Sequence, residues 1–224
     1  MPESLDYKSK WNNYKIGKIP WINSIREHSH RNRFVDYVVG KQDITKILEM
    51  GAGEAIEAQA IISKKQNVDY TIIDVSDTFL EHAKSLNIKA FEMNMTKTMF
   101  KDKYFDLVYT SCVLEHSPNI SKTIKEMCRV SDLFYITLFK WRFKTGDLES
   151  DFQSRKSYFS TEFNIFLLLQ EIEKYGIIDS MTICTKDGKY VDYFSYLKDC
   201  KGMDLHRNGN YLSIIGEWKD GITL

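Results

Sequence analysis

Short apolar runs and amphipathic stretches alternate through the middle of the chain. Five runs have the length and the β-branched or aromatic content of buried strands. They lie at residues 46–50, 70–74, 88–91, 104–110 and 133–139, and helix-like stretches at 54–65, 77–86 and 119–130 separate most of them. Alternating strands and helices are joined by right-handed crossovers, so the pattern predicts an α/β fold with a mainly parallel sheet covered on both faces.

The first forty residues follow a different pattern. Residues 1–20 are polar with scattered aromatic rings and are interpreted as an arm. A helix is expected over residues 21–39, with Gly40 as its stop signal. We therefore divide the chain into an N-terminal arm and helical cap over residues 1–40 and a main domain over residues 41–224.

The C-terminal part begins with a strongly apolar stretch at residues 160–176, which predicts a helix capped by Ser160 or Thr161. Two more strands are expected at residues 177–185 and 210–218. The segment between them is rich in Tyr and Phe and is too long for a tight hairpin.

Composition and charge narrow the possible classes of protein. The chain has 224 residues, 43% of them hydrophobic, and it carries 31 basic and 31 acidic side chains. This balance does not favour nucleic acid or an anionic membrane as a partner, and no segment reaches membrane-spanning length. The four cysteines are scattered, so we expect reduced thiols in a cytoplasmic protein, with neither disulfides nor a metal site.

The first predicted strand runs into a glycine-containing turn in the stretch ILEMGAGEAIEAQ, residues 47–59. Gly51 and Gly53 suit a tight turn that a ligand approaches closely. Ile56 stands where a dinucleotide-binding fingerprint needs a third glycine. The nearby carboxylates Glu49 and Glu54 would repel a pyrophosphate but would attract a cofactor with cationic groups. S-adenosylmethionine (SAM), with a sulfonium and an ammonium, has that charge pattern.

Residues 45–140 resemble the class I, Rossmann-like SAM-dependent methyltransferases. The stretch Glu49-Met50-Gly51-Ala52-Gly53 matches the E/D-x-G-x-G motif of that family, and the stretch at residues 105–119 contains its frequent V-L-E-H signature. The resemblance implies a three-layer sandwich with seven strands, mostly parallel, and an antiparallel strand near the C-terminus. It also implies a set of cofactor-binding residues: Glu49, Gly51, Ala52, Gly53, Asp74, Val75, Asn94, Met95 and Ser111.

Two residues of this set have specific roles in the family. Asp74 ends the second strand, where an acidic residue accepts hydrogen bonds from both ribose hydroxyls. Asn94 stands where the family usually has Asp, and its carbonyl oxygen can accept a hydrogen bond from the adenine amino group.

His116 is the candidate catalytic residue, because it follows the fourth strand at the rim where an acceptor would meet the methyl group. An imidazole with a pKa of about 6.5 can take a proton from a hydroxyl or an ammonium nucleophile. Two alternatives remain open: Glu115 and His116 only orient the loop, or transfer proceeds by proximity alone. Cys112, in the same loop, is interpreted as a buried small hydrophobe.

Three other groups of residues allow more than one interpretation or argue against a site. His28 and His30 are two residues apart on the expected helix and point to different faces, which argues against metal binding. The basic and aromatic stretch at residues 138–144 is either a solvated loop or a contact for an anionic or aromatic acceptor. Trp11, Tyr14 and Trp21 form either a lid over the cofactor or part of the core.

The sequence thus predicts a SAM-dependent methyltransferase that acts on an oxygen or nitrogen of a small-molecule or glycan-type acceptor and releases S-adenosylhomocysteine. One alternative is a catalytically inactive SAM-binding partner or regulatory protein. The other is an NAD(P)-dependent oxidoreductase, against which the acidic turn argues.

Overall fold

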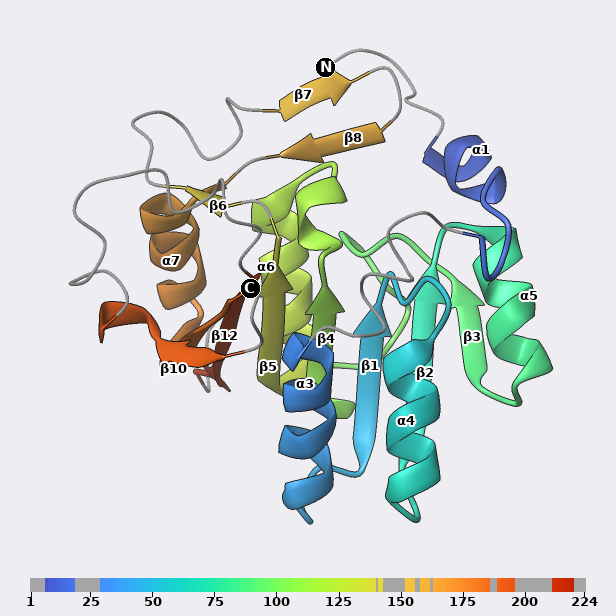
Figure 1. The fold of residues 1–224 in the computed structure, drawn as a ribbon, viewed down its shortest axis with the longest axis horizontal. Helices are drawn as coiled ribbons and strands as arrows, with labels where there is room; N and C mark the ends of the chain where they lie inside the picture. Colours follow the sequence, from blue (N-terminus) through green and yellow to red (C-terminus); the bar gives the residue numbers. More distant parts are fainter. Residues whose placement is uncertain are drawn as a thin grey trace.

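A computed structural model describes residues 7–18, 29–139, 141–142, 152–155, 158–161, 163–185, 189–195 and 211–219. Within these residues the main element is an eight-stranded sheet in the order β11-β10-β12-β5-β4-β1-β2-β3 (Figure 1). The strands are β1 (Lys46–Met50), β2 (Asp69–Asp74), β3 (Lys89–Glu92), β4 (Phe105–Ser111), β5 (Ser131–Leu138), β10 (Gly176–Cys184), β11 (Tyr190–Asp192) and β12 (Tyr211–Trp218). The predicted α/β class is confirmed.

Strand direction divides the sheet into two parts. β1 to β5 are parallel to one another, whereas β12 runs antiparallel to both β5 and β10. The seven predicted strands are all present, and the antiparallel strand lies near the C-terminus as expected. The sheet gains an eighth strand because β11, from the aromatic segment, pairs with β10. Three residues with no clear alternation gave no signal for it.

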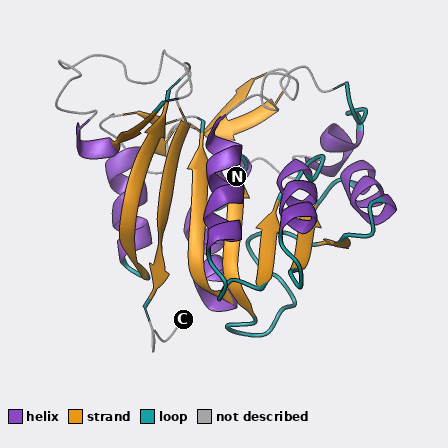
Figure 2. Cartoon of the chain, turned by 60° about the horizontal axis from the view of Figure 1, so that its bottom comes forward, coloured by secondary structure: helices purple, strands orange, loops and turns teal. Residues whose placement is uncertain are grey.

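Helices cover both faces of the sheet (Figure 2). On one face α3 (Ser29–Gly40), α4 (Ile56–Lys64) and α5 (Asp77–Ser85) enclose a core. On the other face α6 (Ile120–Val130) and α7 (Ile165–Glu173) enclose a second core. No helix within the described residues is long and apolar enough to cross a membrane.

Side-chain caps fix where two of these helices begin, close to the carboxyl ends of the parallel strands. The hydroxyl of Ser76 accepts a hydrogen bond from the backbone N–H of Phe79 and starts α5. The amide oxygen of Asn119 accepts from the N–H of Lys122, at 2.9 Å, and starts α6. α4 has no side-chain cap and begins after Ala55, which is left-handed with φ 55°. The unusual backbone of this turn belongs to the site described below.

Two predicted helices differ from the structure. The helix expected over residues 160–176 begins only at Ile165, and the proposed caps Ser160 and Thr161 belong instead to β8 (Tyr158–Thr161). That prediction was wrong because β8 pairs with β7 (Phe152–Arg155), and this pairing overrides the local capping signal. The helix expected over residues 21–39 is described only from Ser29 onward, as α3, and residues 21–28 lie outside the described residues.

Three further elements are short. They are α1 (Tyr7–Asn12), β6 (Trp141–Arg142) and β9 (Phe163–Asn164). β6 and β9 pair with each other in parallel, and α1 lies beside α5, above the carboxyl ends of the parallel strands (Figure 1).

Candidate cofactor and acceptor site

A cavity of about 360 Å³ opens at the carboxyl ends of the parallel strands. In open α/β sheets this edge is the usual ligand site. All ten residues predicted from the sequence line it, namely His116, Glu49, Gly51, Ala52, Gly53, Asp74, Val75, Asn94, Met95 and Ser111. The fold thus brings the whole predicted set to one place.

The two glycines of the turn have different structural reasons to be glycine. Both have a positive φ, 74° at Gly51 and 53° at Gly53. A Cβ on Gly51 would lie 2.2 Å from Cγ2 of Val113, so this residue permits close packing against the loop after β4. A Cβ on Gly53 would meet nothing within 4 Å. The empty space beside Gly53 can therefore hold part of a ligand.

Asp74 is held in place by backbone donors at the end of β2. Its Oδ1 accepts from the N–H groups of Val75 and Ser76, at 2.8 and 3.0 Å, and Oδ2 faces the N–H of Gly53 at 3.4 Å. Burial raises the pKa of this carboxyl to about 6, against the lowering effect of these backbone hydrogen bonds. A fixed carboxylate with free lone pairs can accept from two neighbouring hydroxyls.

Two more carboxylates lie buried at the floor of the cavity. Glu49 accepts from the hydroxyl of Tyr70 at 2.9 Å, and burial and the neighbouring Glu57 raise its pKa well above the usual range. Glu57 accepts from Tyr109, at 3.3 Å, and from Nη1 of Arg31, at 3.0 Å. Burial opposes the charge of Arg31, but Glu57 and other nearby groups outweigh this and raise its pKa. The floor is therefore a hydrogen-bonded network with more acidic than basic side chains.

Asn94 lines the cavity, but its side-chain oxygen already accepts hydrogen bonds within the chain. Oδ1 accepts from both the N–H and the hydroxyl of Thr96, each at 2.9 Å, in a local turn. Thr96 therefore competes with an adenine amino group for the side-chain oxygen of Asn94. Met93 and Met95, on either side of Asn94, supply apolar lining.

His116 ends the short 3₁₀ helix η1 (Leu114–His116) after β4. Its ring lies edge-on to Trp11, with 5.1 Å between ring centroids, and 6.2 Å from the ring of Phe139. Glu115 is fully buried, and its Oε1 accepts from the backbone N–H of Phe139 at 2.7 Å. Glu115 thus ties the loop that carries His116 to the end of β5.

Ser111 and Cys112, which come shortly before η1, also line the cavity. Ser111 has a buried hydroxyl without a hydrogen-bond partner among the described residues. Cys112 was expected to be a buried apolar filler, but it is only half-buried, lines the cavity and has φ 55°. Burial of the sulfur, followed by the charge of Glu115, raises the pKa of this thiol well above the usual value, which does not favour a nucleophile.

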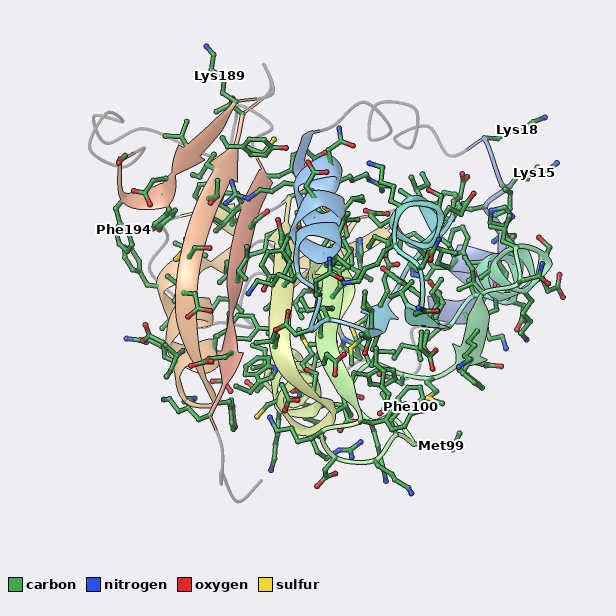
Figure 3. The ribbon with its side chains drawn as sticks, turned by 90° about the horizontal axis from the view of Figure 1, so that it is seen from below. Lys15, Lys18, Met99, Phe100, Lys189 and Phe194 are labelled. Carbon is green, nitrogen blue, oxygen red and sulfur yellow. The ribbon has the colours of Figure 1, made fainter. Side chains whose placement is uncertain are left out.

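The segment over residues 7–18 lies beside the cavity, which Trp11 lines, and we call it the strap. Asn12 contacts the start of α5: its Oδ1 accepts from the hydroxyl of Ser76 at 3.0 Å, and its amide donates to Asp77 at 3.2 Å. The N–H of Gly17 donates to Glu54 at 2.6 Å. Trp11 lines the cavity, whereas Lys15 and Lys18 project outward (Figure 3).

Sequence reasoning missed several cavity residues that come from distant parts of the chain. Arg31 from α3 and Tyr211 from β12 were not predicted at all, and Phe139 was considered only as part of a loop. Tyr211 stacks on the buried His30, with ring centroids 4.0 Å apart. Trp21, His28 and residues 143–150 lie outside the described residues. None of the three missed residues belongs to a recognisable motif, and only the sheet order brings them together.

Metal-ligand and disulfide chemistry find no support in the described residues. No group of three His, Cys, Asp or Glu side chains there could hold a metal ion. Cys112, Cys128 and Cys184 are free thiols.

Comparisons with known proteins agree with this geometry. Residues 48–132 match the family described as a methyltransferase domain, whereas no curated protein sequence matches the chain. Geranyl diphosphate C-methyltransferase from Streptomyces coelicolor, solved with Mg²⁺, geranyl diphosphate and S-adenosylhomocysteine, is 12% identical with a TM-score of 0.65, covering 97% of this chain and 98% of that one.

Two other solved structures show how far the fold is shared. A SAM-dependent methyltransferase from Methanosarcina mazei is 16% identical, covers 79% of this chain and 93% of that one, and has a TM-score of 0.57. The [4+2]-cyclase SpnF is 12% identical, covers 84% of this chain and 80% of that one, and has a TM-score of 0.64. At such identities the likeness concerns the fold, which also carries chemistry other than methyl transfer.

Residues 48–132 thus match a methyltransferase domain, and the chain has the Rossmann-like fold of the class I SAM-dependent methyltransferases. The resemblance predicted from the E-x-G-x-G and V-L-E-H motifs is confirmed, and SAM is the cofactor of that class.

Proposed function

We propose that this protein transfers a methyl group from SAM to an oxygen or nitrogen of a small-molecule or glycan-type acceptor. The observation that carries the proposal is the cavity, which combines a glycine cradle, a backbone-held Asp74 and an acidic floor. A zwitterionic cofactor with a cationic sulfur is favoured there, and a pyrophosphate is not.

The cavity offers suitable contacts for each part of SAM. Asp74 would accept from the ribose hydroxyls, and the apolar side chains of Phe79, Met93 and Met95 would cover the adenine. The open space at Gly53 would take the methionine chain, and Glu49 would favour the ammonium. The unpartnered hydroxyl of Ser111 offers one more polar contact.

SAM supplies an electrophilic methyl group on a sulfonium that is already a good leaving group. The protein would then contribute orientation, exclusion of water and, where needed, removal of a proton from the acceptor. His116 is proposed for proton removal, since its ring lines the cavity between Trp11 and Phe139. These two rings would also shield the reaction from water and favour an acceptor with an apolar or planar part.

A SAM-binding protein without catalysis, acting as a partner or regulatory subunit, is the alternative. The cavity residues named above serve binding and do not distinguish it from an enzyme. An NAD(P)-dependent oxidoreductase is less favoured, because four acidic side chains, Glu49, Glu54, Glu57 and Asp74, line the cavity.

Calorimetric titration with S-adenosylhomocysteine, with NAD as the parallel control, tests the cofactor. Micromolar binding of the first and none of the second is expected. Incubation with SAM and a panel of hydroxyl and amine acceptors, followed by detection of released S-adenosylhomocysteine, then separates enzyme from binding protein. NAD binding without S-adenosylhomocysteine binding would contradict the proposal.

A further inference from the structure

The cavity extends along the sheet from the end of β2 to the start of β12. Asp74 ends β2, whereas Phe139 directly follows β5 and Tyr211 begins β12. β1, β4 and β5 lie between β2 and β12 in the sheet order. Phe139 and Tyr211 also lie outside residues 48–132, the part of the chain that matches the methyltransferase domain. The end of the cavity opposite the proposed ribose contact is therefore built from residues that the family match does not cover.

The register of the sheet makes Phe139 and Tyr211 neighbours. β5 and β12 are antiparallel and Leu138 pairs with Leu212, so the next pair in this register is Phe139 with Tyr211. Residues that are directly opposite in an antiparallel pair point to the same face, with their Cβ atoms about 4.5–5.5 Å apart. Two aromatic side chains thus stand next to each other at this end of the cavity.

Each of the two rings has a contact that fixes its orientation. The ring of Tyr211 stacks on that of His30, a fully buried residue of α3, with centroids 4.0 Å apart and planes inclined by 21°. The ring of Phe139 lies 6.2 Å from that of His116. Trp11, which also contacts His116, adds a third ring to the cavity lining. Flat apolar surfaces of this kind favour a planar ring as the ligand beside them.

The charges around the cavity restrict the acceptor further. Four carboxylates line the cavity, and among the described lysines and arginines only Arg31 does so. Arg31 is already paired with Glu57, with 3.0 Å between Nη1 and Oε2. The acidic side chains would therefore repel an anionic acceptor, but they would not repel an uncharged ring.

The candidate base His116 favours one kind of nucleophile. An aromatic hydroxyl has a pKa of about 10, as in a tyrosine side chain, against about 6.5 for an imidazole. Water has a pKa of about 16, and an alkyl hydroxyl is similarly weak as an acid. Transfer of the proton to an imidazole thus costs much less free energy from an aromatic hydroxyl than from an alkyl hydroxyl.

We propose that Phe139 and Tyr211 form the acceptor subsite, and that the acceptor is an uncharged aromatic ring bearing the hydroxyl to be methylated. This inference rests on the proposed function and names the acceptor class within it. The hydroxyl oxygen forms the bond to the methyl carbon while the carbon–sulfur bond breaks and its electron pair stays with sulfur. The hydroxyl proton passes to His116. Phe139 and Tyr211 determine specificity, because they contact the ring of the acceptor and not its reacting oxygen.

Binding of three probes to the protein saturated with S-adenosylhomocysteine tests the proposal. The probes are 4-methylphenol, 4-methylcyclohexanol and 4-methylbenzoate, which are similar in size and differ in aromaticity or charge. Titrations followed by ligand-observed NMR at pH 7 should show that 4-methylphenol binds at least 5-fold more tightly than either of the others. The cyclohexanol lacks the contacts between aromatic rings, and the benzoate meets the charge repulsion.

Substitutions connect this selectivity to the two rings. Phe139→Leu and Tyr211→Leu should each weaken binding of 4-methylphenol at least 5-fold, change that of 4-methylcyclohexanol less than 2-fold, and keep the affinity for S-adenosylhomocysteine within 3-fold. Tyr211→Phe retains the ring and should bind 4-methylphenol within 2-fold of the unaltered protein. Phe139→Leu does not disturb the stack on His30, so it keeps the test decisive if Tyr211→Leu fails to fold. Phe91→Leu, at an exposed position of β3 outside the cavity, is the matched control.

Four results would overturn the inference: equal affinity for 4-methylphenol and 4-methylcyclohexanol, tightest binding of 4-methylbenzoate, no binding of any probe, or an equal loss for both alcohols in Phe139→Leu. Each of them leaves the proposed function standing, since that function includes non-aromatic acceptors. No binding of S-adenosylhomocysteine by the unaltered protein would instead remove the proposed function, and this inference with it.

Discussion

Val113 fills the space that a side chain at position 51 would need, since a Cβ on Gly51 would lie 2.2 Å from its Cγ2. Gly51 belongs to the turn after β1 and Val113 to the loop after β4, and these two strands are neighbours in the sheet. The contact fixes the distance between the turn that carries the cofactor residues and the loop that carries His116.

Gly51→Ala should therefore be much more damaging than Gly53→Ala. Both substitutions place a side chain at positive φ, which costs about 1–2 kcal/mol, but only Gly51→Ala adds a clash, worth about another 1–3 kcal/mol. Urea denaturation should show the larger loss for Gly51→Ala. Gly53→Ala should fold and yet bind S-adenosylhomocysteine at least 10-fold more weakly, because its methyl group enters the cavity. Similar stabilities for the two variants would contradict the packing described for Gly51.

Asp74→Asn should change stability and binding in opposite directions. The raised pKa of Asp74, about 6, means that the folded state retains this proton more strongly than the unfolded state does. Ionisation therefore destabilises the fold: the penalty is absent below pH 4, grows between pH 4 and 6, and reaches about 3 kcal/mol at pH 7. Relative to the unaltered protein, Asp74→Asn should be stabilised more at pH 8 than at pH 4.5.

At pH 8 the same variant should bind S-adenosylhomocysteine more than 10-fold more weakly, because charge-assisted hydrogen bonds to the ribose are lost. For the unaltered protein, affinity should decline as the pH falls through 6. Denaturation curves and calorimetry at the two pH values check both effects. Unchanged affinity in Asp74→Asn would remove the ribose-binding role.

Glu115 should stabilise the fold through the hydrogen bond that it accepts from the backbone N–H of Phe139. Glu115→Ala leaves that partly buried N–H without this acceptor, with an expected loss of about 1–3 kcal/mol in the free energy of unfolding. Glu115→Gln keeps an acceptor oxygen and should retain most of the stability. Because Glu115 is not among the residues that line the cavity, affinity for S-adenosylhomocysteine should stay within about 3-fold in the Gln variant. An equal loss of stability in both variants would show that the negative charge is what matters.

His116→Gln distinguishes a base from a loop residue. General-base catalysis contributes about 10²- to 10⁴-fold, so the rate of a single turnover should fall by that factor on any acceptor that is methylated. The acid limb of the pH–rate profile should disappear, while affinity for S-adenosylhomocysteine changes little. A loss below about 5-fold, with the pH profile unchanged, would assign His116 to orienting the loop. Glu81→Gln, at an exposed position of α5, is a suitable control.

The parallel half of the sheet could be predicted because its signals are local. β1 matches the predicted run 46–50 residue for residue, and the remaining strands of this half differ by two residues or fewer at each end. Gly51 and Asp74 were found because motif and strand end coincide. The start of α7 was misplaced because the hairpin of β7 and β8 depends on pairing between segments, which a local pattern does not contain.

The rest of the site depends on long-range arrangement. Arg31 lies well before the glycine turn in sequence, and Tyr211 lies 160 residues after Gly51. Each reaches the cavity only because α3 packs beside α4, and because β12 pairs with β5. The competition for Oδ1 of Asn94 arises from a turn closed by Thr96, which a motif comparison cannot reveal.

The strap has a consequence for the timing of each reaction cycle. It is fastened on one side to the start of α5 through Asn12 and on another to Glu54 through Gly17, and Trp11 reaches into the cavity between these points. We therefore expect residues 7–18 to move each time SAM enters and each time S-adenosylhomocysteine leaves, so that a covalent link between the strap and α5 would slow repeated turnover more than a single turnover on preloaded cofactor.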